Sequence, residues 1–172
     1  MTVSIYTLGG TIDKVYFDQQ SAFEIGEPTV GQILAEANVT VDYTIQALLH
    51  KDSLDMTAAD RQFVVAKVSA DPCDQIVVTH GTDTMIDTAL ALSSIAGKVI
   101  VLTGAMQPAR FRTSDATFNI GAAITAVQIL PAGVYIAMNG RIFRPERTRK
   151  NRKLNRFEPI AASGPEPAKD QP

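Results

Sequence analysis

Residues 75–84, QIVVTHGTDT, decide how the fold of this chain is interpreted. Residues 76–78 form a β-branched apolar run whose length suits a strand buried in a parallel sheet. The chain then turns at His80 and Gly81 and enters a helical, apolar-periodic stretch that runs toward Ile95. Hydroxyls, a glycine and a carboxylate therefore follow the strand at its carboxyl end, where ligands bind in open α/β sheets.

The same order of residue types occurs at the start of the chain. An apolar strand at 2–8 leads into Gly9-Gly10-Thr11. Glycines allow a tight turn without Cβ clashes, so this turn can present Thr11 at the sheet edge. Taken alone, Thr11 is better explained as the N-cap of a strand-end turn. Two Gly-Thr turns after two buried strands nevertheless form a pair that one site can use.

Strand-like and helical segments alternate almost throughout the chain. We expect strands at 2–8, 43–48, 75–79, 98–103 and 133–138, and helices at 30–36, 58–70, 84–95 and 116–130. This alternation predicts an α/β fold: a parallel sheet of about five strands with helices on both faces, a flavodoxin-like three-layer sandwich. Thr57 and Asp60 are expected to form a capping pair at the start of the second helix.

Two stretches interrupt the alternation. Residues 13–29 hold turn formers and aromatic residues without a clear period, and a long loop of this kind is typical of a lid. Residues 141–156 hold many arginines and lysines, a pattern that can bind phosphates. Glu146 and Glu158 interrupt the basic run, and Phe143 is the one aromatic residue within residues 141–156. A solvated or subunit-contacting segment is therefore the better explanation.

The length and composition of the chain indicate how many domains it has and what kind of protein it is. The chain has 172 residues, 45% of them hydrophobic, and a net charge of −2. These values predict one domain, at 1–158, and we expect a disordered Pro-rich tail at 159–172. Without a long apolar run or a secretory signal pattern, we expect a soluble, cytoplasmic protein that binds neither membrane nor nucleic acid. With one cysteine, Cys73, and two histidines, we expect no disulfide framework and no structural zinc site.

Polar residues near the expected strand ends have functional and structural explanations. Thr82 can hold a second hydroxyl beside a reacting carbon and Asp83 can bind a cationic amino group, but either can also cap a helix. Ser53 and Asp55 point the same way on an extended segment, which suits recognition of a zwitterion, although such a turn before a helix is common.

Three further observations concern the same edge of the sheet. Small residues at 104–108 let a ligand approach the backbone near Ala105. A lysine of the basic run, if held at this edge among other cations, becomes a usable base. His80 is better explained as a hydrogen-bonded structural residue than as a base.

With these residues in view, the chain resembles the N-terminal domain of the bacterial-type L-asparaginases. The resemblance is carried, in family order, by TLGGTI (7–12), DSLDMT (52–57), VVTHGTDTM (77–85), VLTGAMQP (101–108), SDATFNI (114–120) and MNGRI (138–142). It implies an L-asparagine amidohydrolase that forms L-aspartate and ammonia in two steps through a threonine acyl-enzyme, without a metal or cofactor.

The resemblance also implies the catalytic residues, namely Thr11, Tyr16, Thr82, Asp83 and Lys150. Thr11 would attack the side-chain amide carbon, and Tyr16 would hydrogen-bond Thr11. The lysine is placed by counting from Met138, and Lys153 is the alternative.

The implied substrate-binding residues are Gly10, Ser53, Leu54, Asp55, Gly81, Thr82, Asp83 and Ala105. Ser53 and Asp83 would bind the α-carboxylate and α-amino groups, with Asp55 nearby. Backbone N–H groups at the two Gly-Thr turns would form an oxyanion hole, an interaction worth roughly 3–4 kcal/mol in the barrier.

The chain departs from the family pattern in two respects. The glutamine expected between Ser53 and Asp55 is Leu54, which removes a polar contact to the substrate, so we expect low glutaminase activity. The family's C-terminal domain, whose acidic residue enters a neighbouring subunit's site, is not found in this sequence. We therefore expect exposed surface and self-association into a homo-oligomer, a dimer or tetramer.

Other functions stay open at this point. A non-catalytic asparagine- or aspartate-binding protein derived from the same domain is the main alternative. An amidohydrolase subunit of a tRNA-dependent amidotransferase would use the same site to release ammonia. Nucleic-acid binding through residues 141–156 predicts strongly salt-dependent affinity.

Overall fold

The computed structural model describes residues 1–16 and 23–160, with only the backbone described for Tyr16 and Phe23. Most of the expected tail, from residue 161 onward, lies outside the described residues, as does part of the expected lid. In the part of the chain that is described, no helix has the length and apolar character needed to span a bilayer.

A six-stranded sheet organises the molecule, in the order β4-β1-β5-β6-β7-β8. Its strands are β1 (Thr2–Thr7), β4 (Asp42–Ala47), β5 (Gln75–Thr79), β6 (Val99–Thr103), β7 (Gly133–Met138) and β8 (Arg141–Phe143). The first five are parallel, and β8 pairs antiparallel with β7. Numbered along the chain, the parallel strands follow the order 2-1-3-4-5, which is that of flavodoxin-like folds. The expected fold class is confirmed.

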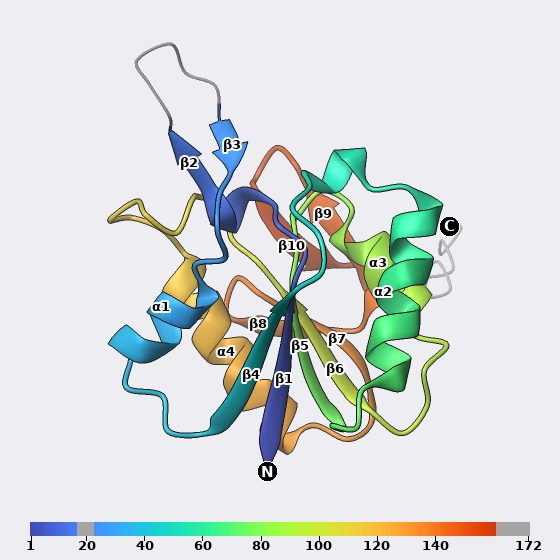
Figure 1. The fold of residues 1–172 in the computed structure, drawn as a ribbon. Helices are drawn as coiled ribbons and strands as arrows, with labels where there is room; N and C mark the ends of the chain where they lie inside the picture. The colour runs from blue at the N-terminus through green and yellow to red at the C-terminus, as the bar shows by residue number, and fades with distance from the viewer. Residues whose placement is uncertain (17–22, 161–172) are drawn as a thin grey trace, which may run out of the picture.

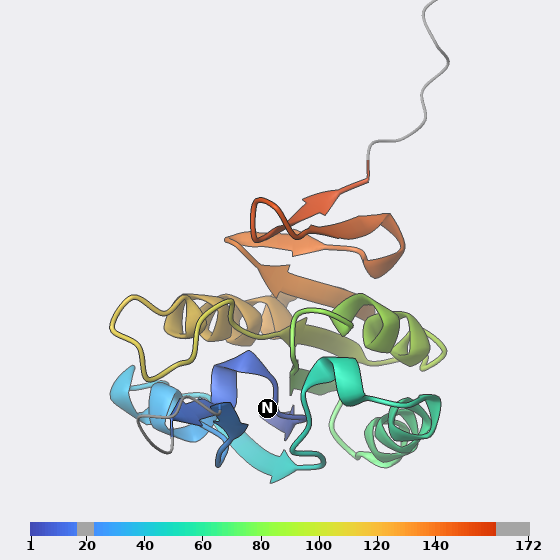
Figure 2. The same cartoon turned by 90° about the horizontal axis from the view of Figure 1, so that it is seen from above.

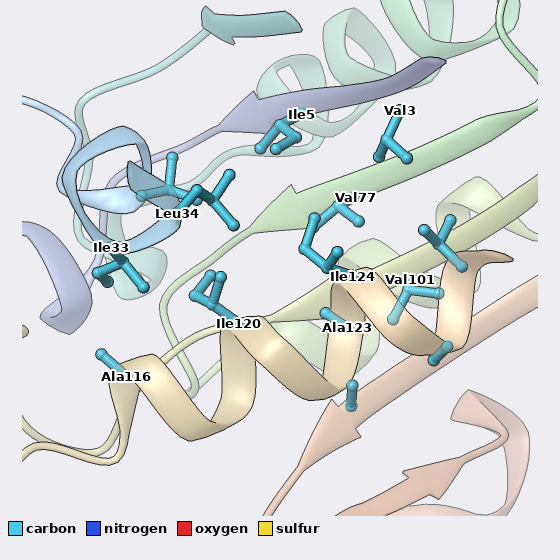
Figure 3. Packing of buried hydrophobic residues seen from close by; sticks show 14 of the residues in the cluster. Val3, Ile5, Ile33, Leu34, Val77, Val101, Ala116, Ile120, Ala123 and Ile124 are labelled. Carbon is cyan, nitrogen blue, oxygen red and sulfur yellow. The ribbon is translucent and has the colours of Figure 1, made fainter. Parts of the chain in front are cut away.

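In the described part of the chain, four α-helices cover the two faces of the sheet (Figures 1 and 2). They are α1 (Val30–Glu36), α2 (Ala58–Ala70), α3 (Met85–Leu92) and α4 (Ala116–Ile129). Helices α1 and α4 pack on one face and form the α1/α4 core with strand residues such as Val3 and Val101 (Figure 3). Helices α2 and α3 form the α2/α3 core on the other face.

The alternation of side chains along β5 explains why both faces are covered. Val77 lies in the α1/α4 core, whereas Ile76 and Val78 lie in the α2/α3 core, and all three are 0% exposed. Successive residues of a strand point to opposite faces, so a continuous apolar run requires a helix layer on each side. At the start of α2, Thr57 and Asp60 form the expected capping box.

The two stretches that interrupt the sequence alternation contain short hairpins. Residues 13–29 include the antiparallel strands β2 (Lys14–Tyr16) and β3 (Phe23–Ile25). The basic stretch continues from β8 into β9 (Thr148–Asn151) and β10 (Arg156–Pro159), which pair with each other. Phe143 and Phe157 are buried in the α2/α3 core, 6.4 Å apart between ring centroids, so they anchor this basic segment to the domain.

His80 fixes the turn between β5 and α3. Its Nδ1 lies 2.6 Å from the carbonyl oxygen of Gly81, and its Nε2 lies 2.7 Å from Oγ1 of Thr88 on α3. Because a carbonyl only accepts, Nδ1 carries the proton and Nε2 accepts from Thr88. Complete burial lowers the pKa of His80 to about 4, so the ring is neutral at pH 7. This arrangement agrees with a structural role rather than that of a base.

We expect His80 to make the stability of the protein pH-dependent. Its pKa rises from about 4 in the folded chain toward 6.5 on unfolding, so the unfolded state binds the proton more tightly. The stabilising contribution is complete above pH 6.5 and is lost as the pH falls toward 4, by on the order of 2–3 kcal/mol.

Urea unfolding at pH 7 and pH 4.5 measures this loss. The variant His80→Gln lacks the titrating group, so its free energy of unfolding should fall less than that of the wild type over the same interval. Equal losses in the two proteins would contradict the assignment to His80.

Candidate active site

The two Gly-Thr turns lie in direct contact. Gly9 and Gly10 have φ values of 91° and 93°, a backbone conformation that favours glycine. A Cβ added to Gly10 would overlap the Cα and N atoms of Gly81. Thr11 and Thr82, which follow these glycines, are therefore held at one place on the sheet edge. From β1 the chain continues to β4 on one side of it and then to β5 on the other side, so the strand order reverses between β1 and β5. The carboxyl ends of these two strands form the topological switch point, where α/β folds bind ligands.

Ser53 packs against the second turn. A Cβ on Gly81 would lie 2.7 Å from both Cβ and Oγ of Ser53. Thr84 donates a 2.7 Å hydrogen bond from its hydroxyl to the Ser53 carbonyl, which fixes the two segments together. Ser53 is 1% exposed, and its Oγ has no hydrogen-bond partner among the described residues. A buried hydroxyl in this condition is suited to bind a polar group of a ligand.

Lys150 reaches the same turn from β9. Its Nζ donates to Thr82 Oγ1 at 2.7 Å and to Asp83 Oδ1 at 2.9 Å. The Lys150 side chain is 12% exposed and Thr82 is 5% exposed, so this contact is largely shielded from water. Lys153, the alternative lysine of the sequence analysis, is exposed in the turn between β9 and β10. The geometry thus brings Lys150, and not Lys153, to Thr82 and Asp83.

The β9–β10 hairpin places Lys150 through its own anchors. Lys150 pairs with Phe157 across the hairpin, and Phe157 is 2% exposed in the α2/α3 core. The Phe157 N–H also donates to Asn139 Oδ1 at 2.9 Å, which ties β10 to the end of β7. A second cation, Arg152, lies 3.7 Å from Asp83 Oδ1, a contact that the sequence analysis did not anticipate.

Asp13 anchors the hairpin that follows Thr11. Its carboxylate accepts from the backbone N–H and the hydroxyl of Thr29, at 2.8 and 2.9 Å. Its carbonyl accepts from the N–H of Gly26 at 2.8 Å. Burial raises the pKa of Asp13, against the opposing effect of the two Thr29 hydrogen bonds. Both ends of this β2–β3 hairpin are therefore fixed beside the first Gly-Thr turn.

Lys14 links the hairpin to the Ser53 segment. Its Nζ lies 2.8 Å from the carboxylate of Asp52, the residue before Ser53. Neither Asp13 nor Lys14 was identified as a site residue from the sequence, because nothing in the spacing of Asp13 from Thr29 or of Lys14 from Asp52 indicates a contact.

Other residues of the expected site lie apart from this cluster or outside the described atoms. Leu54 is 64% exposed and, with Asp55, lines a neighbouring pocket of about 680 Å³. Ala105 is 1% exposed as a whole residue and belongs to the α1/α4 core, so it is buried in this structure. Tyr16 ends β2, and its side chain lies outside the described residues, so its bond to Thr11 stays a prediction.

The cluster suits acyl transfer. A threonine hydroxyl after a glycine turn is a candidate nucleophile, and a second threonine bonded to a lysine can take part in proton transfer. Among the described residues, no group of three or more His, Cys, Asp or Glu side chains is arranged to hold a metal ion.

Comparison with known proteins identifies relatives of this chain. A family model described as "Asparaginase, N-terminal" matches residues 2–163. L-asparaginase 1 of Escherichia coli (strain K12) is 37% identical over 105 residues, which cover 58% of this chain and 31% of that protein. A glutamyl-tRNA(Gln) amidotransferase subunit of Methanococcus vannielii is 46% identical over 69 residues, or 39% of this chain and 16% of that protein.

Solved structures give the same result. The thermostable L-asparaginase of Thermococcus kodakarensis superposes with a TM-score of 0.79 at 28% identity, over 92% of this chain and 51% of that chain. L-asparaginase I of Vibrio cholerae superposes with a TM-score of 0.77 at 29% identity over the same shares. The chain spans about half the length of these structures and less of the curated relatives. Because the family model matches residues 2–163, which are most of this chain, the chain belongs to the asparaginase N-terminal domain family.

Proposed function

We propose that the protein is an L-asparagine amidohydrolase, which hydrolyses the side-chain amide to L-aspartate and ammonia. The observation that supports this most is the contact of Lys150 with Thr82 and Asp83, at a turn packed against the one that carries Thr11. We infer the substrate class from the L-asparaginases to which the chain is similar.

In the proposed reaction, Thr11 Oγ attacks the amide carbon of the substrate. The hydroxyl proton passes through Thr82 to the Lys150 amine and returns along the same path to the amide nitrogen, so that the C–N bond of the tetrahedral intermediate breaks and ammonia leaves. The aspartyl ester on Thr11 is then hydrolysed by water through the same relay in reverse. Asp83 Oδ1 accepts a hydrogen bond from Lys150 Nζ at 2.9 Å and so keeps the lysine aligned with Thr82. No step of this reaction calls on a metal or an organic cofactor.

Substrate binding uses the surroundings of this relay. The buried Ser53 hydroxyl would bind the α-carboxylate, and Asp83 would bind the α-ammonium with the Oδ2 atom that Lys150 does not contact. Backbone N–H groups of the two Gly-Thr turns would stabilise the oxyanion, because such donors act most strongly in a site that excludes water. Tyr16 would close on Thr11 from the β2–β3 hairpin.

We also propose that the protein is cytoplasmic and assembles into a homo-oligomer. Free Cys73 is compatible with a reducing compartment, and the similar Campylobacter jejuni protein is described as a probable cytoplasmic L-asparaginase. Self-association is supported by large apolar side chains on the surface, among them Phe118 and Ile129.

A non-catalytic asparagine- or aspartate-binding protein is the second candidate. It is favoured by Leu54, whose exposed apolar side chain cannot hydrogen-bond a substrate beside Ser53. The contacts of Lys150 weigh against it, because binding alone needs no lysine on a second hydroxyl.

The test of the nucleophile and relay is ammonia release from L-asparagine. We expect turnover by the wild type, a loss of at least about 10³-fold in Thr11→Ala, and a loss of about 10²–10⁴-fold in Lys150→Met. Lys153→Met is the matched control, since it removes an exposed lysine of the same hairpin and should stay near wild-type activity.

Each other outcome has a defined meaning. Turnover that survives in Thr11→Ala and disappears in Thr82→Ala would move the nucleophile to Thr82. No turnover by a wild type that still binds asparagine in calorimetry would support the binding protein and exclude the amidohydrolase.

Leu54 is expected to limit activity on glutamine. We expect kcat/KM to be lower for glutamine than for asparagine, and Leu54→Gln to raise the glutamine value by restoring a polar group next to Ser53. Ammonia release measured side by side for both substrates provides the test. Comparable kcat/KM values for the two amides in the wild type would refute this prediction.

A further inference from the structure

Lys14 connects the turn of Thr11 to the segment of Ser53. Its backbone N–H donates to the carbonyl oxygen of Thr11 and so closes the short 3₁₀ helix Thr11–Asp13. Its side-chain Nζ lies 2.8 Å from Oδ2 of Asp52, the residue before Ser53. One residue therefore contacts both the backbone of the candidate nucleophile and the chain next to the hydroxyl that would bind the α-carboxylate.

Asp52 shapes the turn that carries Ser53. It is the N-cap of the 3₁₀ helix Ser53–Asp55. Its Oδ1 accepts from the Leu54 N–H at 3.1 Å, and its carbonyl oxygen accepts from the Asp55 N–H at 3.0 Å. A helix of three residues does not hold its form alone. The orientation of the Ser53 backbone therefore depends on where the Asp52 side chain is held.

The two carboxylate oxygens of Asp52 have separate partners. Oδ1 caps the turn, whereas Oδ2 faces the Lys14 Nζ. Burial raises the pKa of the Asp52 carboxyl, but the hydrogen bonds from Lys14 and from the Leu54 N–H outweigh burial and leave the pKa below its usual value. The side chains are 24% exposed for Lys14 and 31% exposed for Asp52, so the ion pair is partly shielded from water.

The backbone around Lys14 is anchored at the first Gly-Thr turn. The N–H of the preceding residue, Asp13, donates to the Gly10 carbonyl at 3.2 Å. The Asp13 carboxylate accepts two hydrogen bonds from Thr29, and Asp13 is 2% exposed. Lys14 therefore extends from a fixed backbone, and its ion pair transmits that position to the Ser53 turn.

The other side of Ser53 is held independently of this ion pair. The Ser53 carbonyl accepts from the Thr84 hydroxyl at 2.7 Å, and its Cβ lies against Gly81. A change that frees Asp52 leaves these contacts in place. The turn should then loosen on its amino-terminal side and not unfold.

We propose that Lys14 and Asp52 are positioning residues, whose ion pair holds the Ser53 hydroxyl where it meets the α-carboxylate of a substrate whose side-chain amide lies at Thr11. The pair acts through Ser53 and not by contact with the substrate. This inference rests on the proposed amidohydrolase activity and adds two residues to those on which substrate binding depends.

The effect of the pair is expected on binding. The α-carboxylate is remote from the bond that breaks, so its contact with Ser53 is present in the bound substrate and in the transition state alike. Loss of such a contact raises KM and leaves kcat nearly unchanged. An ion pair with a structural role alone would instead lower the melting temperature without changing KM.

Two single variants break the ion pair in different ways. Asp52→Asn removes the charge and keeps an oxygen that can cap the turn, and Lys14→Met removes the cation. Lys14→Arg retains the cation. Lys51→Met is the matched control, because Lys51 makes an ion pair of 2.9 Å, with Asp60, from the residue next to Asp52. Asp60 stays fixed without it through the capping box with Thr57.

Steady-state ammonia release and calorimetry with L-aspartate, the proposed product, test the pair. In Lys14→Met and in Asp52→Asn we expect the KM for L-asparagine and the Kd for L-aspartate to rise about 3- to 5-fold, with kcat within about twofold of the wild type. The double variant should be no weaker than either single variant, because both changes remove one interaction. Lys14→Arg and Lys51→Met should stay near the wild type, and circular dichroism melts show whether each variant is folded.

Other results would overturn the pairing. Effects that multiply in the double variant, or an effect of Lys14→Met that Asp52→Asn lacks, would show that the two residues act separately. Unchanged KM and Kd in both single variants would exclude a positioning role. A wild type that binds L-aspartate without hydrolysing L-asparagine would overturn the proposed reaction, while the L-aspartate affinities of the variants would still decide the role of the pair.

Discussion

The contact between Gly10 and Gly81 is the constraint on which the site depends. A side chain at Gly10 would overlap backbone atoms of the second turn, so the two turns can meet only because glycine stands there. This contact sets the positions of Thr11 and Thr82 together, before any ligand is bound. Ser53 is packed against Gly81 by the same kind of close approach. Small residues thus determine the site geometry, and the hydroxyls that follow them supply its chemistry.

The lysine at this site is positioned by apolar packing and not by a glycine turn. Lys150 lies on a hairpin after the last parallel strand, and Phe157 anchors that hairpin in the α2/α3 core. Burying the polar end of a lysine is costly unless it is hydrogen-bonded, and here Asp83 and Thr82 meet that requirement. The apolar packing of Phe157 and the polar contacts of Lys150 therefore support each other across the hairpin.

Sequence patterns predict best the helices and strands whose bounds are set by residues within or next to the element itself. The expected bounds 30–36, 58–70, 75–79 and 133–138 coincide with α1, α2, β5 and β7. A capping box begins α2, and β5 is a continuous apolar run that only a fully buried strand explains. The hairpins β2–β3 and β9–β10 show no such pattern, because their strands are three or four residues long and rich in charge. Short strands depend on what they pack against, and that lies elsewhere in the chain.

The sequence by itself determined the α/β class, the two Gly-Thr turns and the residue types available at the sheet edge, because strand–helix alternation and glycine turns are local properties. The tertiary structure alone decided that Lys150 rather than Lys153 reaches Thr82, since the hairpin register, fixed by a buried Phe157, selects which side chain faces the turn. It also decided that Ser53 is buried, with a hydroxyl that has no partner among the described residues, while Leu54 points to solvent. These outcomes depend on contacts between residues far apart in the chain, and spacing in the sequence does not encode which of them form.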